Sequence, residues 1–299
     1  MPIPGPSHRT EITGWDTEYW VLATDHRPLL SMDTARIAAL LEPFLEQALP
    51  QSQLDQISIY IDLLLRWNAR INLTAIRHEE EIVTRHFGES FFLARHLFPA
   101  SVARTLLSAT ADTTRQPAIP PSPRPCHPER SHAIREADSM AESKDPYSPE
   151  RPPGVLGAPL HPPRVLDIGS GAGFPALPLK LWAPNIHLTL IESNHKKAVF
   201  LREVARALTL TNINVLTGRA QALAPSLTSQ ADVVTLRAVE RLETVLPQAV
   251  TFLAPKGTLA LLITTPQIPQ VLALTNLEWQ AQINVPKSRS RVLLIGYKA

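Results

Sequence analysis

The chain has 299 residues, a formal net charge of +2 and a single cysteine. This length allows one large or two small domains with a buried core, and the balanced charge permits a nucleic-acid partner without requiring one. One cysteine excludes an internal disulfide framework and a four-cysteine zinc site. No run of about eighteen apolar residues occurs and residues 1–10 are polar, so we expect neither a membrane span nor a signal peptide, and a cytoplasmic protein.

Residues 1–31 show no hydrophobic period, and we expect them to form a disordered N-terminal extension upstream of a possible true start at Met32. A helical pattern of apolar residues begins at Asp33-Thr34, a pair suited to cap a helix. A second apolar helical face follows and is expected to end near Trp67. Thr74 is then expected to cap a third helix, whose first turn is acidic. Residues 32–103 are therefore predicted to be a small helical module.

The composition changes between residues 104 and 163. Thirteen of the 29 prolines lie from Pro117 to Pro163, among serine, arginine and glutamate residues. Without a hydrophobic period this stretch cannot offset the entropy lost on ordering, so we expect a disordered insertion. Cys126, His127 and His132 lie inside it without a fourth ligand, and no metal site is predicted.

Apolar strands and helical segments alternate after Arg164. Strands are expected at about 164–168, 187–191, 212–216, 232–236 and 257–263, with helices between them. Such alternation builds a parallel sheet covered by helices on both faces. Two last apolar segments, at about 279–285 and 291–297, are expected to form a closing hairpin. Residues 164–299 are therefore predicted to be one α/β domain.

The first of these strands leads into Gly169, Gly171 and Gly173. Glycines at every second position allow a tight turn and close approach of a ligand to the backbone. Glu192, at the end of the next strand, is suited to hold a ribose diol. The spacing differs from the dinucleotide fingerprint G-x-G-x-x-G, and Asp167 stands two places before the first glycine. The pattern Asp-x-Gly-x-Gly-x-Gly is similar to the nucleotide motif of S-adenosylmethionine (SAM) methyltransferases.

Motifs in both halves of the chain together resemble the bacterial RsmG (GidB) family. These motifs are Trp67-Asn68, Asn72-Leu73-Thr74, Arg85-His86, Glu89-Ser90, residues 166–175, Lys197, Phe200-Leu201 and Arg237-Ala238. The resemblance covers about residues 35–100 and 164–298. It implies a class I SAM-dependent methyltransferase fold, Rossmann-like, with a mostly parallel sheet and a closing antiparallel strand. It also implies methyl transfer to guanine N7 in 16S ribosomal RNA, with either 16S rRNA or the small ribosomal subunit as partner. We further expect the protein to be a monomer.

Three features depart from the family pattern. The insertion at 104–163 has no counterpart, and Ile263-Thr264-Thr265 stands where a lysine-glycine pair is usual. Ala220-Gln221 replaces a hydrophobic-acidic pair after the third strand.

The residues also constrain the acceptor atom. Methylation of cytosine C5 needs a cysteine nucleophile, and the only cysteine lies in the predicted insertion. Exocyclic amines are commonly methylated beside an Asn/Asp-Pro-Pro-aromatic turn, whereas residues 236–239 here read Leu-Arg-Ala-Val. Guanine N7 has an in-plane lone pair and no proton to remove, so positioning and charge stabilisation suffice without a general base.

We assign the cofactor contacts to one end of the sheet. Asp167, the three glycines and Glu192 are expected to form the SAM site, with Phe174 packed on the cofactor and the backbone of Ala220-Gln221 at its adenine edge. Arg237 ends the fourth strand at the crevice where doubly wound sheets bind ligands. It is expected to contact the methionine carboxylate, an RNA phosphate or the guanine edge; the structural alternative is a surface ion pair with Glu240 or Glu243.

Basic residues on the helical module and on the helix after the second strand are candidates for an RNA phosphate track. His86 is equally compatible with a place in the core, and Arg202 with Arg206 share one helix face. The candidates are Arg66, Arg70, Arg77, Arg85, His86, Lys196, Lys197, Arg202 and Arg206.

Three other functions stay open from the sequence. An NAD-dependent oxidoreductase on the same fold is disfavoured by Asp167 and the glycine spacing. A SAM-dependent enzyme of small molecules would not need the basic helical module. A degenerate family member would bind RNA without transferring a methyl group.

Overall fold

The computed structural model describes residues 32–99, 161–238 and 241–299. The predicted N-terminal extension and nearly all of the predicted insertion, with Cys126, His127 and His132, lie outside the described residues. Glu240, one of the two acids considered as a partner of Arg237, also lies outside them.

The helical module begins where the sequence predicts it. The carboxylate of Asp33 accepts a hydrogen bond from the backbone N–H of Ala35 and so caps the first helix. The module's elements are α2 (Thr34–Leu41), η1 (Glu42–Phe44), α3 (Gln51–Ile71), α4 (Glu79–Glu81), the π-helix η2 (Ile82–Gly88) and α5 (Glu89–Leu97).

Two expectations about this module are wrong. Helix α3 does not end at Trp67 but continues to Ile71, and Asn72 ends it in the left-handed conformation (φ 49°). Asparagine tolerates that conformation better than most residues, which explains a helix end four residues later. Thr74 caps no helix, because α4 starts at Glu79 with His78 before it. The Thr74 hydroxyl instead lies 2.8 Å from Nε2 of His86.

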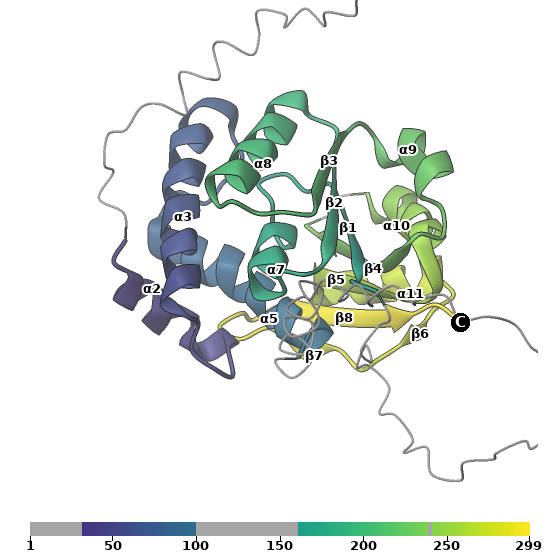
Figure 1. The fold of residues 1–299 in the computed structure, drawn as a ribbon. Coiled ribbons are helices and arrows are strands. Elements are labelled where there is room, and N and C mark those ends of the chain that lie inside the picture. Colours follow the sequence, from purple (N-terminus) through teal and green to yellow (C-terminus); the bar gives the residue numbers. More distant parts are fainter. Residues whose placement is uncertain (1–31, 100–160, 239–240) are drawn as a thin grey trace, which may run out of the picture.

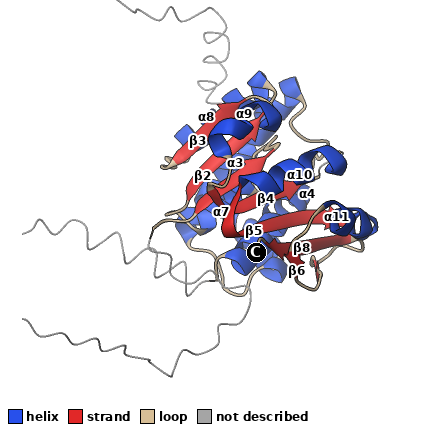
Figure 2. Cartoon of the chain, turned by 90° about the vertical axis from the view of Figure 1, so that its right-hand side faces the viewer, coloured by secondary structure: helices blue, strands red, loops and turns tan. Residues whose placement is uncertain are grey.

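The second half of the chain forms one mixed sheet, as predicted. Its strands are β1 (Arg164–Ile168), β2 (His187–Glu192), β3 (Ile213–Thr217), β4 (Ala231–Arg237), β5 (Leu253–Thr264), β6 (Glu278–Trp279), β7 (Ile283–Asn284) and β8 (Arg291–Tyr297). The order is β3-β2-β1-β4-β5-β8-β6, with β7 also paired to β8. The first five strands are parallel, and β8 runs antiparallel to β5. Figure 2 shows these strands side by side with helices on both sides.

The connecting helices divide between the two faces of the sheet according to the direction of the crossover. Helices α7 (Ala176–Trp182) and α8 (His195–Ala207) cover the face that also packs against the helical module. The opposite face is covered by α9 (Ala220–Leu227), α10 (Leu242–Phe252) and α11 (Ile268–Leu274). Figure 1 shows α3, α7 and α8 on one side of the strands and α9 and α10 on the other.

The helical module shares a core with the sheet. Tyr60 and Phe87 of the module lie in the same hydrophobic cluster as Phe200 of α8 and Val233 of β4. Burial of apolar surface therefore fixes the module on one face of the sheet. In the described part of the chain, no helix combines the length and the apolar character needed to cross a membrane.

Candidate functional site

The carboxyl ends of β1, β2 and β4 bring three predicted site elements to one edge of the sheet. The glycine loop follows β1, Glu192 ends β2, and Arg237 ends β4. The loop is held by backbone hydrogen bonds from the N–H groups of Gly169 and Ser170 to the carbonyl of Ile191. The edge of the sheet is thus the place where the sequence predicts the cofactor.

The three glycines of this loop have positive φ angles of 72°, 54° and 87°, but they serve two purposes. A Cβ atom on Gly169 would meet nothing within 4 Å, and one on Gly171 would meet only the carbonyl of Gly169 at 3.8 Å. A Cβ atom on Gly173 would lie 2.3 Å from the hydroxyl of Tyr60. The first two glycines therefore border open space, whereas the third allows α3 to approach the loop.

Glu192 is buried, and its two carboxylate oxygens join the glycine loop to the segment that follows β2. Its Oε2 accepts a hydrogen bond from the N–H of Gly171 at 2.8 Å, and its Oε1 accepts one from the N–H of Asn194 at 2.7 Å. Each carboxylate oxygen has a second lone pair, so both can still accept a hydroxyl. This geometry is compatible with the predicted ribose contact.

Asp167 lies beneath the loop, 1% exposed. Its Oδ1 accepts a hydrogen bond from the hydroxyl of Thr235 on β4 at 2.6 Å, while its Oδ2 is buried without a partner among the described residues. Burial raises the pKa of Asp167 to about 6, although the hydrogen bond from Thr235 opposes this shift. A second donor to Oδ2 would lower the free energy of the ionised form.

Phe174 connects the loop to the helical module. Its ring stacks against Tyr60 at 5.2 Å and against the imidazole of His86 at 4.6 Å, and the edge of Phe87 meets it at 5.1 Å. The hydroxyl of Tyr60 also donates a hydrogen bond to the carbonyl of Ala172 at 2.6 Å. The predicted contact of Phe174 with the cofactor stays a prediction, since these side chains already pack on it.

Arg237 is a buried residue, with only 6% of its side chain exposed. Residues Val233, Thr235 and Arg237 alternate along β4 toward the helical module, so the guanidinium points under η2 and α5. Its Nη2 donates to the carbonyl of Arg85 at 2.7 Å and forms an ion pair with Glu89 at 3.2 Å. The ion-pair partner is therefore Glu89 rather than the nearby Glu243.

The Nη2 atom of Arg237 also lies 3.0 Å from Nδ1 of His86. Because a guanidinium has no acceptor, Nδ1 must be unprotonated, and Nε2–H donates to the hydroxyl of Thr74. Burial, together with the positive charge of Arg237, lowers the pKa of His86 to about 2. His86 is therefore a neutral, buried residue, as its core alternative expects.

Glu89 compensates two arginines at this edge. Its Oε2 lies 3.2 Å from Arg237 and 3.2 Å from Nη1 of Arg291, the first residue of β8. Burial raises the pKa of Glu89, and the two guanidinium groups oppose the shift. Burial likewise lowers the pKa of Arg237, to about 10, so this arginine stays charged at neutral pH.

The donor and acceptor set at this edge fits a nucleotide-like cofactor. Oδ2 of Asp167 and Nη1 of Arg237 are both buried without a partner among the described residues, on adjacent strands. Ala220 and Gln221 form the first turn of α9 beyond β3, where backbone N–H groups lack acceptors within the helix. The open space over Gly169 lies at the same edge of the sheet, in the loop that follows β1.

Comparison with known proteins identifies the family. The sequence model of the rRNA small subunit methyltransferase G family (GidB) matches residues 53–103 and 158–285. This chain belongs to that family. The resemblance expected from the motifs is confirmed, as is the class I methyltransferase fold.

Relatives of known name support the assignment. Ribosomal RNA small subunit methyltransferase G of Roseiflexus castenholzii is 34% identical over 218 residues, 70% of this chain and 67% of the relative. Its namesake in Streptococcus pyogenes serotype M5 is 30% identical over 214 residues, 71% of this chain and 65% of the relative. The chain thus matches about two thirds of the relatives' length.

Among solved structures, a SAM-dependent methyltransferase from Aquifex aeolicus has a TM-score of 0.41 and 16% identity, and the match covers 47% of this chain and 85% of that one.

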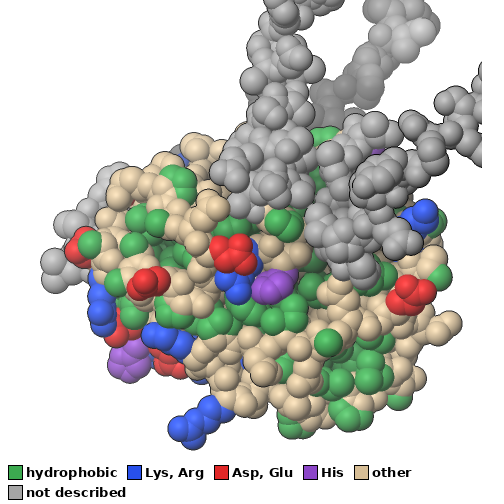
Figure 3. Space-filling model, turned by 90° about the horizontal axis from the view of Figure 1, so that it is seen from below, with side chains coloured by type: hydrophobic (Ala, Val, Ile, Leu, Met, Phe, Trp, Pro, Cys, Tyr) green, Lys and Arg blue, Asp and Glu red, His purple; other side chains and the backbone are tan. Residues whose placement is uncertain are grey.

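The basic residues proposed for a GidB-family RNA track lie in different surroundings. Arg85 pairs with Glu81, Arg66 with Asp62 and Arg206 with Glu203. Arg202 donates to the carbonyl of Val215 and the hydroxyl of Thr217, and Arg77 donates to Asn72. Arg70 and Lys196 are exposed and Lys197 is half-buried. On the face seen in Figure 3, basic, acidic and hydrophobic side chains are interspersed.

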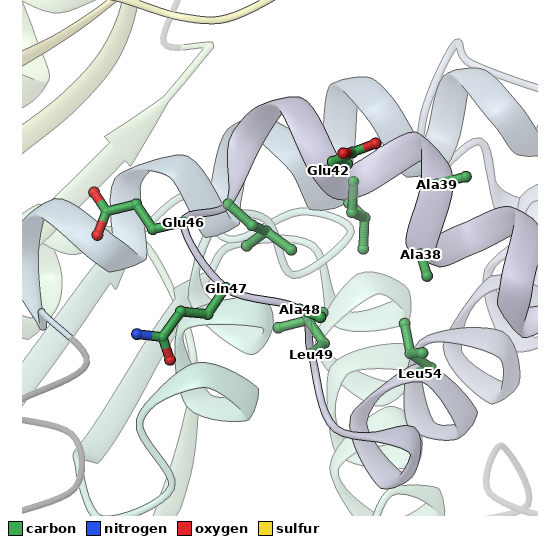
Figure 4. Close-up of a pocket in the computed structure, with 10 residues that line it drawn as sticks. Ala38, Ala39, Glu42, Glu46, Gln47, Ala48, Leu49 and Leu54 are labelled. Carbon is green, nitrogen blue, oxygen red and sulfur yellow. The ribbon is translucent and has the colours of Figure 1, made fainter.

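A cavity of about 420 Å³ lies elsewhere, between α2, α3 and the segment that joins them. Ala38, Glu42, Leu49 and Leu54 are among its lining residues (Figure 4). None of the lining residues belongs to the predicted site.

Four residues that shape the site were not predicted. Thr235 shares a face of β4 with Val233 and Arg237, so period-two counting along the strand would have placed it beside Asp167. Glu89 belongs to one of the family motifs, but no role was assigned to it, and Tyr60 and Arg291 reach the site through tertiary packing, for which the sequence carries no local signal.

We expect Gly173→Ala to destabilise the fold far more than Gly169→Ala, although both positions have positive φ. Left-handed strain costs about 1–2 kcal/mol at each position, but only the Gly173 Cβ collides with Tyr60. Tyr60→Phe removes the colliding hydroxyl and should restore part of the stability of Gly173→Ala. Equal melting temperatures for the two glycine variants would contradict this division of roles.

A pH-dependent gain in stability is expected for Asp167→Asn in the absence of ligand. Because the folded-state pKa of Asp167 lies above the usual 3.8, its ionised form destabilises the fold; this penalty is complete above about pH 6 and vanishes toward pH 3.8. Thermal unfolding should therefore show a gain of roughly 2 kcal/mol at pH 7.5 and little at pH 4.

Asp232→Asn, on the adjacent strand β4, serves as the opposite control. Partial burial raises the pKa of Asp232, but hydrogen bonds from Arg164 outweigh it and lower the pKa below its usual 3.8. This variant should therefore lose stability at pH 7.5, and the loss should shrink as the pH falls below 3.8. A gain for Asp167→Asn of the same size at pH 4 and pH 7.5 would show that the carboxylate charge is not the cause.

Proposed function

We propose that this chain transfers the methyl group of SAM to N7 of a guanine in 16S ribosomal RNA. Membership of the rRNA small subunit methyltransferase G family supports the enzyme class, the cofactor and the ribosomal RNA substrate. Two observations carry the proposal: the open space over Gly169, and two buried polar atoms on adjacent strands, Asp167 Oδ2 and Arg237 Nη1, that have no partner among the described residues. These groups suit a ligand that has both donors and a carboxylate.

Each residue of the edge has a defined task in this proposal. Glu192 holds the ribose hydroxyls while its carboxylate fixes Gly171, and the free N–H groups at the start of α9 face the adenine. Arg237 offers Nη1 to the methionine carboxylate or to guanine O6. SAM supplies an electrophilic methyl group on a sulfonium; the N7–methyl bond forms as the sulfur–methyl bond breaks, and the positive charge passes to the base.

The protonation states around Arg237 favour N7 as the acceptor. His86 has a pKa of about 2 and uses Nδ1 as an acceptor for Arg237, so it cannot take up a proton at neutral pH. Burial, and next the negative charge of Asp167, raises the pKa of Tyr60 well above its usual value. Neither group is suited to general-base catalysis, and N7 needs none because it carries no proton. Catalysis then rests on positioning and on charge.

The proposed substrate also indicates in which compartment the protein acts. Ribosomal RNA is found in the cytoplasm of a bacterium, and we propose that the protein acts there as a monomer on the small subunit.

Transfer of labelled methyl groups tests the proposed function. Purified full-length protein, methyl-deuterated SAM and small subunits from a strain without a GidB-family enzyme should yield one N7-methylguanine on mass mapping of 16S rRNA. Gly169→Val is the control, because a branched side chain fills the open space over the loop. Label in a different base, or no label with bound SAM, would exclude guanine-N7 transfer; in the second case the chain would be a non-catalytic RNA-binding relative.

Arg237→Lys is expected to reduce the methylation rate by roughly 100-fold or more, since lysine cannot supply a planar fork with one free nitrogen. Glu89→Gln is the matched comparison: it removes the charge of the buried carboxylate and costs stability, but the guanidinium keeps its hydrogen bond to the carbonyl of Arg85. Single-turnover rates with saturating SAM should fall much less in Glu89→Gln. If the methylation rate and the stability fall by the same amounts in both variants, Arg237 acts through packing alone.

A further inference from the structure

We propose that a groove between η2 and the turn before β8 binds phosphate groups of the RNA substrate next to the methylated base. This inference rests on the proposed function and adds a substrate-binding surface to it. The groove has a volume of about 310 Å³ and is lined on one side by Phe44, Thr84, Arg85 and Glu89. Residues 286–291 line its other side.

The groove opens at the edge of the sheet that carries the candidate site. Arg291 pairs with Thr264, the last residue of β5, so the turn before β8 lies at the carboxyl end of the parallel strands. Glu89 belongs to both places: one of its oxygens contacts Arg237 of the site and Arg291 of the groove, each at 3.2 Å. A nucleotide chain with its base beside Arg237 would therefore continue past the groove.

Positive charge dominates the lining of this groove. Arg85, Lys287, Arg289 and Arg291 contribute four cations, against the single acid Glu89. Glu89 is only 4% exposed and already lies between two guanidinium groups. The guanidinium groups of Arg237 and Arg291 already compensate the negative charge of Glu89. Glu89 therefore does little to reduce the positive charge of the turn.

The cations of the turn are available to a ligand. Lys287 and Arg289 are exposed, and within the described part of the chain their side chains make no hydrogen bond or ion pair. Arg85 is 46% exposed, and its pair with Glu81 at 2.9 Å is of the surface kind that contributes at most about 1 kcal/mol. A phosphate can displace such a partner.

The turn is preorganised by its own hydrogen bonds. The N–H of Ser288 donates to the carbonyl of Val285, and the N–H of Val285 donates to the carbonyl of Arg291. The hydroxyl of Ser288 accepts from the N–H of Arg291 at 3.0 Å. These hydrogen bonds already fix the backbone that carries Lys287 and Arg289. Binding of a phosphate would therefore cost mainly the conformational entropy of the two side chains.

Phosphate is the chemistry that these residues fit best. Cations, hydroxyls and backbone groups make most contacts to nucleic-acid backbones, and those contacts set register without reading sequence. Thr84, Ser288 and Ser290 add hydroxyl groups to the four cations of the lining. No exposed aromatic ring is among the lining residues, so stacking of bases is not expected in this groove.

Salt-dependent binding of a 16S rRNA transcript tests the groove in the full-length protein. The double variant Lys287→Gln/Arg289→Gln should weaken binding at least several-fold, and its slope of log K against log salt should be less steep by about 2, one for each phosphate contact. Lys287→Gln alone should change the slope by about 1. SAM affinity by calorimetry should equal that of the parent.

Lys256→Gln is the matched control for Lys287→Gln. Both lysines are exposed and both have a left-handed backbone, with φ of 61° and 55°, but Lys256 lies near the start of β5, at the opposite edge of the sheet. Its removal should leave transcript binding and slope unchanged.

Three results separate the possible failures. In the first, the double variant binds the transcript with the affinity and salt slope of the parent, and the parent methylates 16S rRNA. This result would show that the groove does not bind phosphate and would leave the proposed function intact. An equal loss of binding to polyglutamate and to the transcript would also overturn the phosphate groove, in favour of an acidic protein partner. A parent that binds neither SAM nor the transcript would instead overturn the proposed function on which the groove rests.

Discussion

The buried ion pair between Arg237 and Glu89 is the constraint on which the rest of the site depends. Arg237 comes from the central strand β4 and Glu89 from the helical module, so the pair joins the two halves of the chain. A buried charge without a partner costs several kcal/mol, and this cost is avoided only when the module is seated on the sheet. The candidate site and the module therefore form one structural unit, although 60 residues separate the two halves at 104–163 in the sequence.

The aromatic contacts around Phe174 extend this dependence to the glycine loop. Tyr60 bonds to the backbone of the loop and stacks on Phe174, and the imidazole of His86 lies on the same ring and accepts from Arg237. A shift of η2 would move both the guanidinium and the loop. The π-helix that carries His86 is a rare conformation, often found at functional sites, and here it directs His86 to Arg237 and Thr74. In this family member the helical module thus helps to shape the candidate site.

Much of the fold could be predicted from local patterns. Alternation of apolar strands and helices gave the parallel sheet, and the spacing of Asp167, Gly169, Gly171 and Gly173 marked the loop after β1. The predicted break at Trp67 was wrong because the polar residue after it, Asn68, is buried within the helix, and α3 ends only at the left-handed Asn72. Local patterns do not show which element covers the end of β4. The burial of Arg237 and the contact between Tyr60 and Ala172, 112 positions apart, arise from tertiary packing alone.

A structure with bound S-adenosylhomocysteine tests the central claim, that the carboxyl edge seated against the helical module is the cofactor site. The account predicts the product over Gly169 and Gly171, its ribose hydroxyls on Glu192 and a donor or acceptor of the ligand on Asp167 Oδ2 or Arg237 Nη1, with the Arg237–Glu89 pair retained. Product bound elsewhere, or bound there with Arg237 withdrawn from Glu89 and the module displaced from the sheet, would contradict it.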